Sequence, residues 1–319
     1  MLQLKMKKQE EKLSEKMYDL VIIGGGPAGL TAGIYAGRAR LKTLIIEEMI
    51  AGGQSATTEL LENYPGFKDG VGGVELAMIM EEQAKKFNTE VIYDRVVSAS
   101  LLGETKEVHL ASSTIKAKAV IIASGAVPRK LKADGAEKFH GKGISYCATC
   151  DGALFRDKRI VIVGAGNSAI EEGIFMQRFT KDITFVQDLP YLTAEKILQE
   201  RIKSYPETKF YLGTVIKKVN GSDKVESVTA NISKENKEIE IPADGVFVYI
   251  GYTPKADFVS KEINLDSQGY IITDENLKTN IDGVFAAGDV RVKEFRQVVT
   301  AASDGAIAAH SVEKYLENK

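Results

Sequence analysis

The sequence is poor in metal-binding side chains and has no long apolar segment. It contains two cysteines and only three histidines, His109, His140 and His310. A structural zinc site needs four ligands, and no two of these histidines have the short spacing of a zinc-binding pair, so we expect no metal centre. No apolar run approaches the 18 residues that a membrane-spanning helix needs, so we expect no membrane span.

Neither basic nor acidic residues are in clear excess. The chain has 42 basic and 44 acidic residues and a formal net charge of -2. This balance gives no overall field that would attract nucleic acid or an anionic membrane. Residues 1–16 are mostly charged or polar, and we expect them to form a solvated arm without the apolar core of a signal peptide. The composition therefore favours a cytoplasmic protein.

A glycine-rich signature near the N-terminus indicates a dinucleotide-binding fold. The expected elements are a strand at 18–23, a turn from Gly24 through Gly26, Pro27 and Ala28 to Gly29, a helix at 30–39 and a strand at 43–46. Gly24 permits the tight turn, Gly26 lets the backbone approach a pyrophosphate, and Gly29 allows the helix to pack against the strand. Glu47, at the end of the second strand, is placed to accept hydrogen bonds from ribose hydroxyls.

The same arrangement recurs in the middle of the chain. It comprises a strand at 159–163, a turn containing Gly164, Gly166, Asn167, Ser168 and Ala169, a helix at 170–179 and a strand at 183–186. Two such units predict an α/β protein with two Rossmann-like nucleotide-binding domains, which often pair a flavin with a pyridine nucleotide. Helix–strand packing alone would also explain the glycines of the second turn, so nucleotide binding there stays open.

A third signal lies late in the chain, where an apolar strand ends in Gly288 and Asp289. A helix that runs towards the C-terminus follows the segment that begins at Phe295. A carboxylate at a strand end and a helix N-terminus could together bind the ribityl chain and phosphate of a flavin. An ordinary turn with a capping aspartate would also explain the pattern. If the segment completes the first nucleotide-binding domain, that domain is discontinuous and the second is inserted into it.

Both cysteines lie in one motif, Cys147-Ala-Thr-Cys150, which Asp151 follows directly. A C-x-x-C pair suits thiol–disulfide exchange, because one thiol has a lowered pKa and its neighbour resolves the mixed disulfide. Half of a zinc site, a static disulfide and two inert thiols are the alternatives. The flanking nucleotide-binding signatures and a reducing cytoplasm favour a redox-active pair, with Asp151 as a proton donor for the leaving thiolate.

Taken together, these motifs resemble the low-molecular-weight thioredoxin reductases, which are two-domain disulfide reductases that contain FAD. The matching segments are 24–29, Gly52-Gly53-Gln54, 62–66, Ala123-Ser124-Gly125 with Arg129, 147–151, 164–169, Gly288-Asp289 and Arg296-Gln297-Val298. The resemblance runs from residue 18 to about residue 316. It implies a FAD-binding domain at 17–126 and 253–319, and a pyridine-nucleotide-like domain at 127–252 that carries the cysteines.

The resemblance also assigns roles to residues and partners. Cys150 would receive electrons from FAD, Cys147 would attack the disulfide of thioredoxin, and Asp151 would be the acid. A homodimer is expected from the family alone. The implied FAD contacts are Gly24, Gly26, Pro27, Ala28, Gly29, Glu47, Gly53, Gln54, Asn63, Ala123, Ser124, Gly125, Gly288, Asp289, Arg296, Gln297 and Val298.

The sequence departs from the family pattern where NADPH would be recognised. Family members that use NADPH have a His-Arg-Arg-x-x-x-Arg run at the end of the second nucleotide strand, whereas this chain has Gln187, Asp188, Leu189 and Thr193. Losing two or three charge-assisted hydrogen bonds to the 2'-phosphate should weaken NADPH binding by orders of magnitude. Asp188 is placed to receive ribose hydroxyls, so the donor could be NADH. Reduced ferredoxin is the alternative donor.

The sequence thus predicts a FAD-dependent thioredoxin reductase whose electron donor is not NADPH. Two other functions stay open at this stage. The chain could be a flavin-dependent redox sensor that signals through its dithiol, or a FAD disulfide oxidoreductase with a partner other than thioredoxin. A flavin-dependent ferredoxin–NADP reductase of the same fold is less compatible, because such enzymes lack the pair formed by Cys147 and Cys150.

Overall fold

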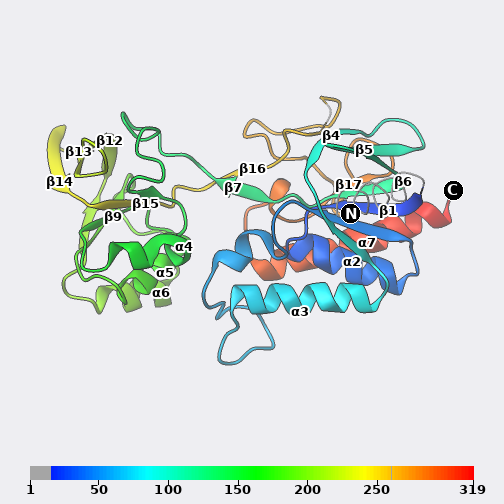
Figure 1. The fold of residues 1–319 in the computed structure, drawn as a ribbon, viewed down its shortest axis with the longest axis horizontal. Helices are drawn as coiled ribbons and strands as arrows, with labels where there is room; N and C mark the ends of the chain where they lie inside the picture. The colour runs from blue at the N-terminus through cyan, green and yellow to red at the C-terminus, as the bar shows by residue number, and fades with distance from the viewer. Residues whose placement is uncertain (1–15, 260) are drawn as a thin grey trace, which may run out of the picture. The chain divides into compact units, whose positions relative to one another are not determined.

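The computed structural model describes residues 16–259 and 261–319, so the expected N-terminal arm lies, except for Lys16, outside the described residues. The chain divides into two compact units (Figure 1). Unit 1 consists of Met1–Val127 and Thr253–Lys319, and unit 2 of Pro128–Tyr252. The two segments that connect them pair as strands β7 (Ala126–Pro128) and β16 (Tyr252–Pro254). Because unit 2 interrupts unit 1, the predicted fold class, with the second domain inserted into the first, is confirmed.

Unit 1 is built on one mixed sheet. Its strands are β1 (Met17–Ile23), β2 (Thr43–Glu47), β3 (Glu90–Tyr93), β4 (Val96–Ser100), β5 (Lys106–Leu110), β6 (Thr114–Ile122) and β17 (Val284–Ala286). The order is β3-β2-β1-β6-β5-β4, and β17 also pairs with β6. Strands β3, β2, β1, β6 and β17 pair in parallel, whereas β4, β5 and β6 pair antiparallel. The helices are α2 (Pro27–Arg38), α3 (Gly73–Lys86) and α7 (Val298–Glu317), with short 3-10 turns η1 (Gly53–Thr57) and η3 (Gly288–Val290).

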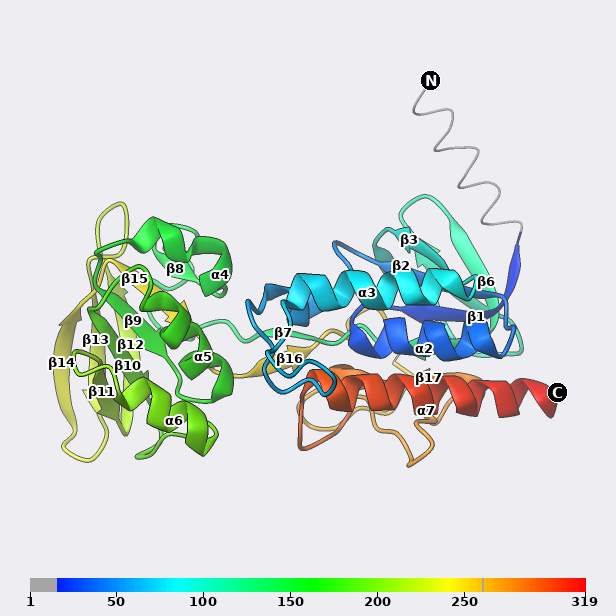
Figure 2. The ribbon, with the colours of Figure 1, turned by 90° about the horizontal axis from the view of Figure 1, so that it is seen from below.

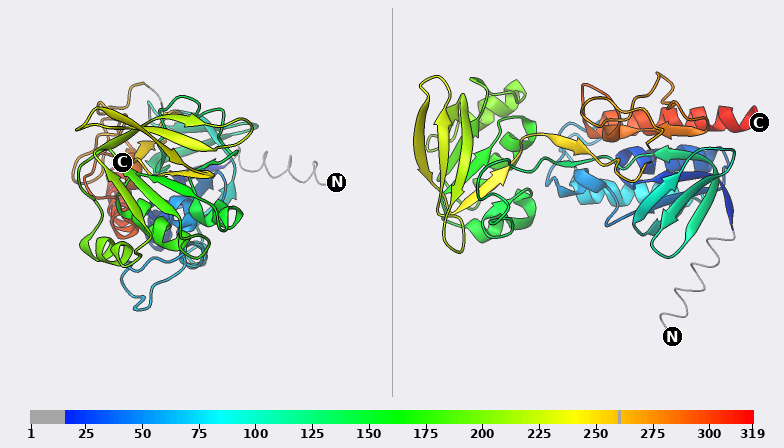
Figure 3. Two further views of the ribbon diagram at one scale, coloured as in Figure 1. Left: turned by 90° about the vertical axis from the view of Figure 1, so that its left-hand side faces the viewer. Right: turned by 90° about the horizontal axis from the view of Figure 1, so that it is seen from above.

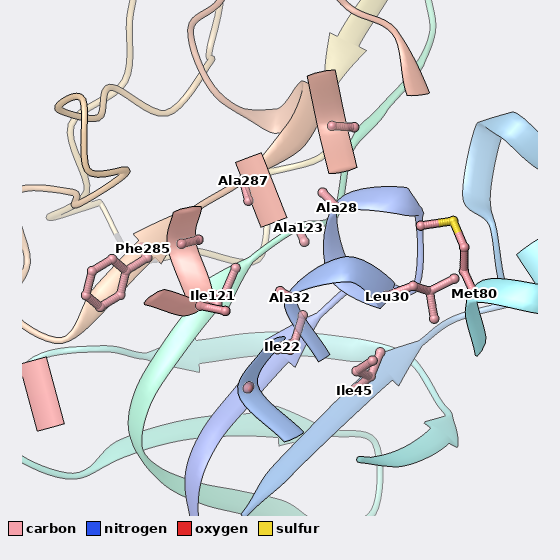
Figure 4. Packing of buried hydrophobic residues seen from close by; sticks show 14 of the residues in the cluster. Ile22, Ala28, Leu30, Ala32, Ile45, Met80, Ile121, Ala123, Phe285 and Ala287 are labelled. Atoms are coloured by element: carbon pink, nitrogen blue, oxygen red, sulfur yellow. The ribbon is translucent and has the colours of Figure 1, made fainter. Parts of the chain in front are cut away.

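The alternation of side chains along β1 divides the core of unit 1 into two layers. Leu20 and Ile22 belong to a buried cluster with residues of α2, α3 and α7, whereas Val21 and Ile23 pack on the other face of the sheet. Figure 4 shows Ile22 with Ala28 and Ala32 of this first cluster. Both faces of the parallel strands are buried. Helices cover one face, and residues of β4, β5 and the segment 256–290 pack against the other. Helices α2 and α7 lie side by side (Figure 2), and a Cβ on Gly305 would come within 2.1 Å of the Ala28 carbonyl oxygen.

Unit 2 has three layers. Its parallel sheet has the order β11-β10-β9-β15-β8, and a separate antiparallel sheet has the order β12-β13-β14. The strands are β8 (Ile144–Ser145), β9 (Ile160–Val163), β10 (Ile183–Gln187), β11 (Lys209–Leu212), β12 (Thr214–Asn220), β13 (Ser227–Ile232), β14 (Lys237–Pro242) and β15 (Gly245–Val248). The helices are α4 (Ala148–Asp151), α5 (Asn167–Met176) and α6 (Lys196–Lys203), and the 3-10 turn is η2 (Gly152–Phe155).

The parallel sheet is the middle layer of unit 2, between the antiparallel sheet and the helices (Figures 2 and 3). Along β9, Val161 and Val163 pack with the antiparallel sheet, whereas Ile160 and Ile162 pack with α5 and α6. The strand is therefore apolar at every position, which is the pattern of a parallel strand buried on both faces.

Helices α2 and α5 each begin three residues before the expected position. The extended residues Gly26 and Gly166 are their N-caps, so the turn residues that follow belong to the first helical turn. In α2 this places Pro27 at the first helical position, where its missing N–H has no cost. None of the described helices is long and apolar enough to cross a membrane.

Candidate active site

The first glycine turn joins β1 to α2 and is shaped by close backbone contacts. Gly24 has φ +109°, and a Cβ there would lie 2.3 Å from the carbonyl oxygen of Ala123. A Cβ on Gly29 would lie 1.9 Å from the Gly24 oxygen, so both positions need glycine. The space over Gly26 is open, because the nearest atom to a Cβ there is the Gly52 oxygen at 3.9 Å. No side chain caps α2, so its first amides fit a phosphate group.

The chain after β2 folds back onto this turn. The Gly52 N–H donates to the Gly25 oxygen (2.8 Å), and a Cβ on Gly53 would lie 3.6 Å from the Gly26 Cα. Gln54 follows as an exposed side chain. The Glu47 carboxylate accepts hydrogen bonds from the N–H groups of Gly25 (2.7 Å) and Met49 (3.0 Å). Glu47 therefore fixes the turn, and its ribose contact stays a prediction.

Predicted FAD residues from distant segments meet in unit 1. The Asn63 Nδ2 donates to the Gln297 Oε1 (3.1 Å) across 234 positions of sequence, and Gln297 is the N-cap of α7. A Cβ on Gly288 would lie 2.9 Å from the Cβ of Ala28. The segment after β6 is held in place because the Ser124 hydroxyl donates to the Lys255 oxygen (2.6 Å). Of these contacts, the one between Gly288 and Ala28 reaches the start of α2, whereas the others tie Asn63 to the N-terminus of α7 and the end of β6 to Lys255.

Two charged side chains in this region have buried atoms without a protein partner. Among the described residues, the Asp289 Oδ1 and the Arg296 Nε are buried and have no hydrogen-bond partner. Burial raises the pKa of Asp289, although the charges of Lys293 and Arg296 act in the opposite direction. The Arg296 guanidinium lies 4.2 Å from the centre of the Tyr270 ring. Unsatisfied buried groups are costly, and the hydroxyls and oxygens of a flavin nucleotide would supply the missing donor and acceptor.

A buried carboxylate that the sequence analysis missed holds this region together. Asp304 on α7 accepts from the Gly288 N–H (3.0 Å), the Arg291 Nε (2.8 Å) and the Lys293 Nζ (2.9 Å). Burial would raise the pKa of Asp304, but these hydrogen bonds outweigh it and the pKa is lowered. No local feature of the sequence marks this role, because it depends on how α7 packs against Gly288.

The two cysteines form a disulfide in unit 2, with Cys147 as the N-cap of α4. The Cys150 N–H donates to the Cys147 Sγ (3.2 Å), and the Thr149 hydroxyl lies 3.3 Å from the same sulfur. Donors around one sulfur favour its thiolate form after reduction. This geometry suits Cys147 as the attacking thiolate. Cys147 is half-buried and Cys150 is exposed.

Two further hydroxyl groups hold the cysteine-containing turn, and the sequence analysis named neither. The buried Ser145 hydroxyl lies 2.7 Å from the Asp151 Oδ2, to which it donates, and it accepts from the Cys147 N–H (3.1 Å). The Tyr249 hydroxyl accepts from the Ala148 N–H (3.0 Å). Ser145 thus fixes the carboxylate of Asp151 within the dithiol turn, where the proposed acid is needed.

The second glycine turn, between β9 and α5, repeats the geometry of the first. Gly164 has φ +109°, and a Cβ there would lie 2.1 Å from the Tyr249 oxygen. Gly166 is an extended N-cap without a side-chain cap, and the nearest atom to a Cβ there is the Thr193 Oγ1 at 3.6 Å. Of the other residues predicted here, Ala169 is buried and Ser168 is half-buried.

The chain after β10 folds back towards this turn. The Asn167 Nδ2 donates to the Glu195 Oε1 (3.0 Å), and the Glu195 N–H donates to the Asn167 Oδ1 (2.8 Å). Gln187 is buried as the last residue of β10, and Asp188 is exposed. No lysine, arginine or histidine occurs between residues 187 and 195. The turn could hold a pyrophosphate, but no cationic side chain of this segment is available for a 2'-phosphate.

Known proteins of similar sequence and fold include several thioredoxin reductases. A family model described as pyridine nucleotide-disulphide oxidoreductase matches residues 18–305. A thioredoxin reductase of Peptoclostridium acidaminophilum is 44% identical over 309 residues, covering 95% of this chain and 98% of that protein. The structure of Lactococcus lactis thioredoxin reductase in its FR conformation has a TM-score of 0.92 at 40% identity, covering 95% of this chain and 100% of that chain.

A ferredoxin-flavin thioredoxin reductase of Clostridium acetobutylicum has a TM-score of 0.52 at 27% identity, covering 95% of this chain and 99% of that chain. The family model spans most of the chain, and the relatives match over nearly their full lengths. The chain therefore belongs to the pyridine nucleotide-disulphide oxidoreductase family and, within it, to the thioredoxin reductases.

Proposed function

We propose that this protein reduces the disulfide of thioredoxin with electrons that pass through FAD to the pair formed by Cys147 and Cys150. The observation that carries the proposal is the dithiol turn, where Cys147 Sγ accepts from the Cys150 N–H and lies beside the Thr149 hydroxyl. The bound flavin would supply the two electrons that reduce the Cys147–Cys150 disulfide. The similarity to thioredoxin reductases supports thioredoxin as the partner.

The residues that would hold FAD are those that meet in unit 1. The first amides of α2, next to the open space over Gly26, would bind the pyrophosphate. The unpartnered Asp289 Oδ1 would accept from a hydroxyl of the ligand, and the Arg296 Nε would donate to one of its oxygens. Asn63 and Gln297, already bonded to each other, would line the same site.

The dithiol would perform two exchange steps. The Cys147 thiolate attacks one sulfur of the thioredoxin disulfide, which forms a mixed disulfide and expels the other sulfur as a thiolate. Asp151, held by Ser145, gives a proton to that thiolate. Cys150 then gives its proton back to the Asp151 carboxylate and attacks the Cys147 sulfur, which expels the second thioredoxin sulfur as a thiolate and restores the Cys147–Cys150 disulfide. That thiolate takes a proton from water, so thioredoxin leaves as a dithiol.

For the electron donor we propose NADH or reduced ferredoxin rather than NADPH. The absence of basic side chains between residues 187 and 195 and the exposed Asp188 argue against binding of a 2'-phosphate. The open N-terminus of α5 supports NADH. The similarity to a ferredoxin-flavin thioredoxin reductase supports ferredoxin, whose potential of about -400 mV lies below that of thioredoxin at about -270 mV.

An anaerobic stopped-flow experiment tests both parts of the proposal. Wild-type protein, Cys147→Ser and Cys150→Ser are mixed in turn with NADH, NADPH and reduced ferredoxin while flavin absorbance and thioredoxin thiols are followed. We expect all three proteins to be yellow and to accept electrons from NADH or ferredoxin, because the cysteines do not hold the flavin. Only the wild type should reduce thioredoxin, with a loss of more than a thousandfold in each variant.

Turnover of thioredoxin by either cysteine variant would contradict the proposed dithiol route. Rapid flavin bleaching by NADPH would contradict the interpretation of residues 187–193. Slow wild-type turnover combined with oxidation-dependent partner binding would instead indicate a redox sensor. The cytoplasmic location and the homodimer stay predictions, which fractionation and sedimentation of the flavin-loaded protein would test.

A further inference from the structure

The first two amides of the dithiol turn are bonded to side-chain oxygens from two neighbouring strands of unit 2. Strand β8 ends at Ser145, whose hydroxyl accepts from the Cys147 N–H. Strand β15 ends one residue before Tyr249, whose hydroxyl accepts from the Ala148 N–H at 3.0 Å. The two strands pair in parallel, so their ends lie at the same edge of the sheet. The pairing of β8 with β15 therefore fixes the positions of the Ser145 and Tyr249 hydroxyl oxygens relative to the dithiol turn.

Two other donors of the turn face the sulfur of Cys147. They are the Cys150 N–H at 3.2 Å and the Thr149 hydroxyl at 3.3 Å. Ala148 is fully buried, so its N–H cannot bond to water if Tyr249 does not accept from it. The Tyr249 hydroxyl thus accepts from the Ala148 N–H, so that the Cys150 N–H and the Thr149 hydroxyl are the donors beside the Cys147 sulfur.

We propose that Tyr249 is a positioning residue for thiol–disulfide exchange, because its hydroxyl fixes the Ala148 amide and thereby the placement of the Cys147 sulfur. The proposal rests on the proposed function only for the identity of the protein that receives the electrons. Tyr249 does not bind the partner in this proposal, since its hydroxyl is engaged with a fully buried residue. Its effect passes through the backbone of the turn.

The Tyr249 hydroxyl stays protonated over the working range of pH. Burial raises the pKa of Tyr249, and the negative charges of Glu172 on α5 and Asp151 on α4 raise it further, with Tyr252 as the other titratable group nearby. The hydrogen bond from Ala148 lowers the pKa but does not outweigh burial. The contact to Ala148 is therefore present in both acidic and alkaline solution, and its contribution to exchange should not depend on pH.

Removing the hydroxyl should favour the reduced form of the pair. In Tyr249→Phe the buried Ala148 N–H has lost its acceptor. The Cys147 thiolate, formed on reduction, is a charged acceptor at the same turn, whereas a disulfide sulfur is a weak one. One hydrogen bond of this kind corresponds to about a tenfold change in the equilibrium constant, or about 30 mV for a two-electron couple.

The chain offers a matched control in Tyr146. Its hydroxyl accepts from the Leu131 N–H at 3.1 Å, so Tyr146→Phe also deletes one hydroxyl bonded to one backbone amide of unit 2. The two variants should lower the melting temperature by similar amounts. Only Tyr249→Phe removes a bond to the dithiol turn, so only this variant should change the properties of the cysteines.

The test equilibrates the full-length, flavin-loaded protein with glutathione buffers and measures the ratio of dithiol to disulfide by alkylation and mass spectrometry. We expect Tyr249→Phe to shift the equilibrium about tenfold towards the dithiol, and Tyr146→Phe to stay within twofold of wild type. With thioredoxin as substrate, kcat should fall about tenfold in Tyr249→Phe while KM stays unchanged, equally at pH 6.5 and pH 8.5.

An unchanged equilibrium and kcat in Tyr249→Phe would overturn the proposal. Equal shifts in the two variants would overturn it as well, because they would show a general loss of stability. If thioredoxin is not the partner, the wild type itself will not turn over thioredoxin. The glutathione equilibrium would still test Tyr249 in that case, so failure of the proposed function and failure of this inference are distinguishable.

Discussion

The two glycine turns of the molecule are nearly the same in backbone geometry. Gly24 and Gly164 both have φ +109°, and their N–H groups each donate at 2.8 Å to the next-to-last residue of the neighbouring strand. Gly26 and Gly166 are both extended N-caps with ψ -177°. Each helix therefore begins with amides that no side chain caps.

The surroundings of the two turns differ. In unit 1 the acid that ends the second strand, Glu47, bonds to the turn itself, and the buried atoms of Asp289 and Arg296 lack protein partners. In unit 2 the last residue of the second strand is Gln187, the next residue, Asp188, is exposed, and the chain after it carries no basic residue up to Glu195. Turns of the same backbone geometry thus have different surroundings, and under the proposed function these surroundings, not the turns, would select the nucleotide.

The largest expected effect comes from adding the same methyl group to both turns. A Cβ would lie 2.3 Å from a carbonyl oxygen in Gly24→Ala and 2.1 Å from one in Gly164→Ala, at the same unfavourable φ. We expect Gly24→Ala to be purified without flavin, with FAD affinity reduced more than a hundredfold. Gly164→Ala should keep its flavin, which the absorbance near 450 nm of the purified protein would measure.

The paired design also separates specific loss from general instability. Both variants should lose similar thermal stability, because the steric conflicts are alike. Loss of flavin from Gly164→Ala at a temperature where that variant is folded would show that the two units do not bind separate ligands. In that case the hypothesis that the first turn binds FAD and the second turn binds a different ligand would be wrong.

A smaller effect is expected where unit 2 departs from NADPH-dependent relatives. Asp188→Arg replaces a repelling charge by a guanidinium that can donate two hydrogen bonds to a phosphate. We expect the rate of flavin reduction by NADPH, relative to NADH, to rise roughly 10- to 100-fold. Stopped-flow bleaching measures this ratio, and Asp223→Arg, the same charge change at another exposed position of unit 2, is the control.

An unchanged ratio in Asp188→Arg would be informative as well. It would indicate that the second turn does not bind a pyridine nucleotide, so that its glycines serve only helix–strand packing. Ferredoxin would then be the donor that remains from the sequence-based hypotheses. The likeness of the two turns would in that case be structural and not functional.

Local patterns account for the part of the fold that could be predicted. The strands β1, β2, β9 and β10 and the glycine turns after β1 and β9 could be predicted, because each pattern lies within a chain segment of about thirty residues. An apolar residue at nearly every position is typical of a strand that is covered on both faces. Helix starts were predicted three residues too late because Asn167 and Ser168 are residues that favour turns, whereas the extended Gly166 already caps the helix.

The contacts that complete the sites could not be predicted, because they depend on which strands are neighbours. Tyr249 and Ala148 are 101 positions apart and meet only because β15 pairs with β8. Asn63 and Gln297 were both predicted to contact FAD, but nothing in the sequence pairs them with each other. Asp304 is indistinguishable in the sequence from a solvent-exposed helical acid until α7 packs against the loop that contains Gly288.

Two acids of unit 1 have pKa values that are shifted in opposite directions. Burial raises the pKa of Asp289, whereas hydrogen bonds from Arg291 and Lys293 lower the pKa of Asp304 in spite of burial. An acid with a raised pKa makes the folded state less stable as pH rises from the unfolded-state pKa of about 4 to the folded-state value, and this loss persists at neutral pH. An acid with a lowered pKa stabilises the folded state above about pH 4, and this contribution disappears as pH falls through the lowered pKa.

Substituting each acid by its amide separates these contributions. In flavin-free protein we expect Asp289→Asn to be more stable than wild type by on the order of 1 kcal/mol at pH 7, and Asp304→Asn to be less stable by about 3 kcal/mol. Denaturant titrations at pH 3.5 and pH 7 should show both differences shrinking at the lower pH. With FAD present, Asp289→Asn should bind the cofactor about tenfold more weakly, because an amide is a poorer acceptor than a carboxylate. If Asp289→Asn were neutral in the flavin-free protein, the carboxylate of Asp289 would not be kept buried at a cost in stability, and its assignment as an acceptor for the cofactor would lose its energetic support.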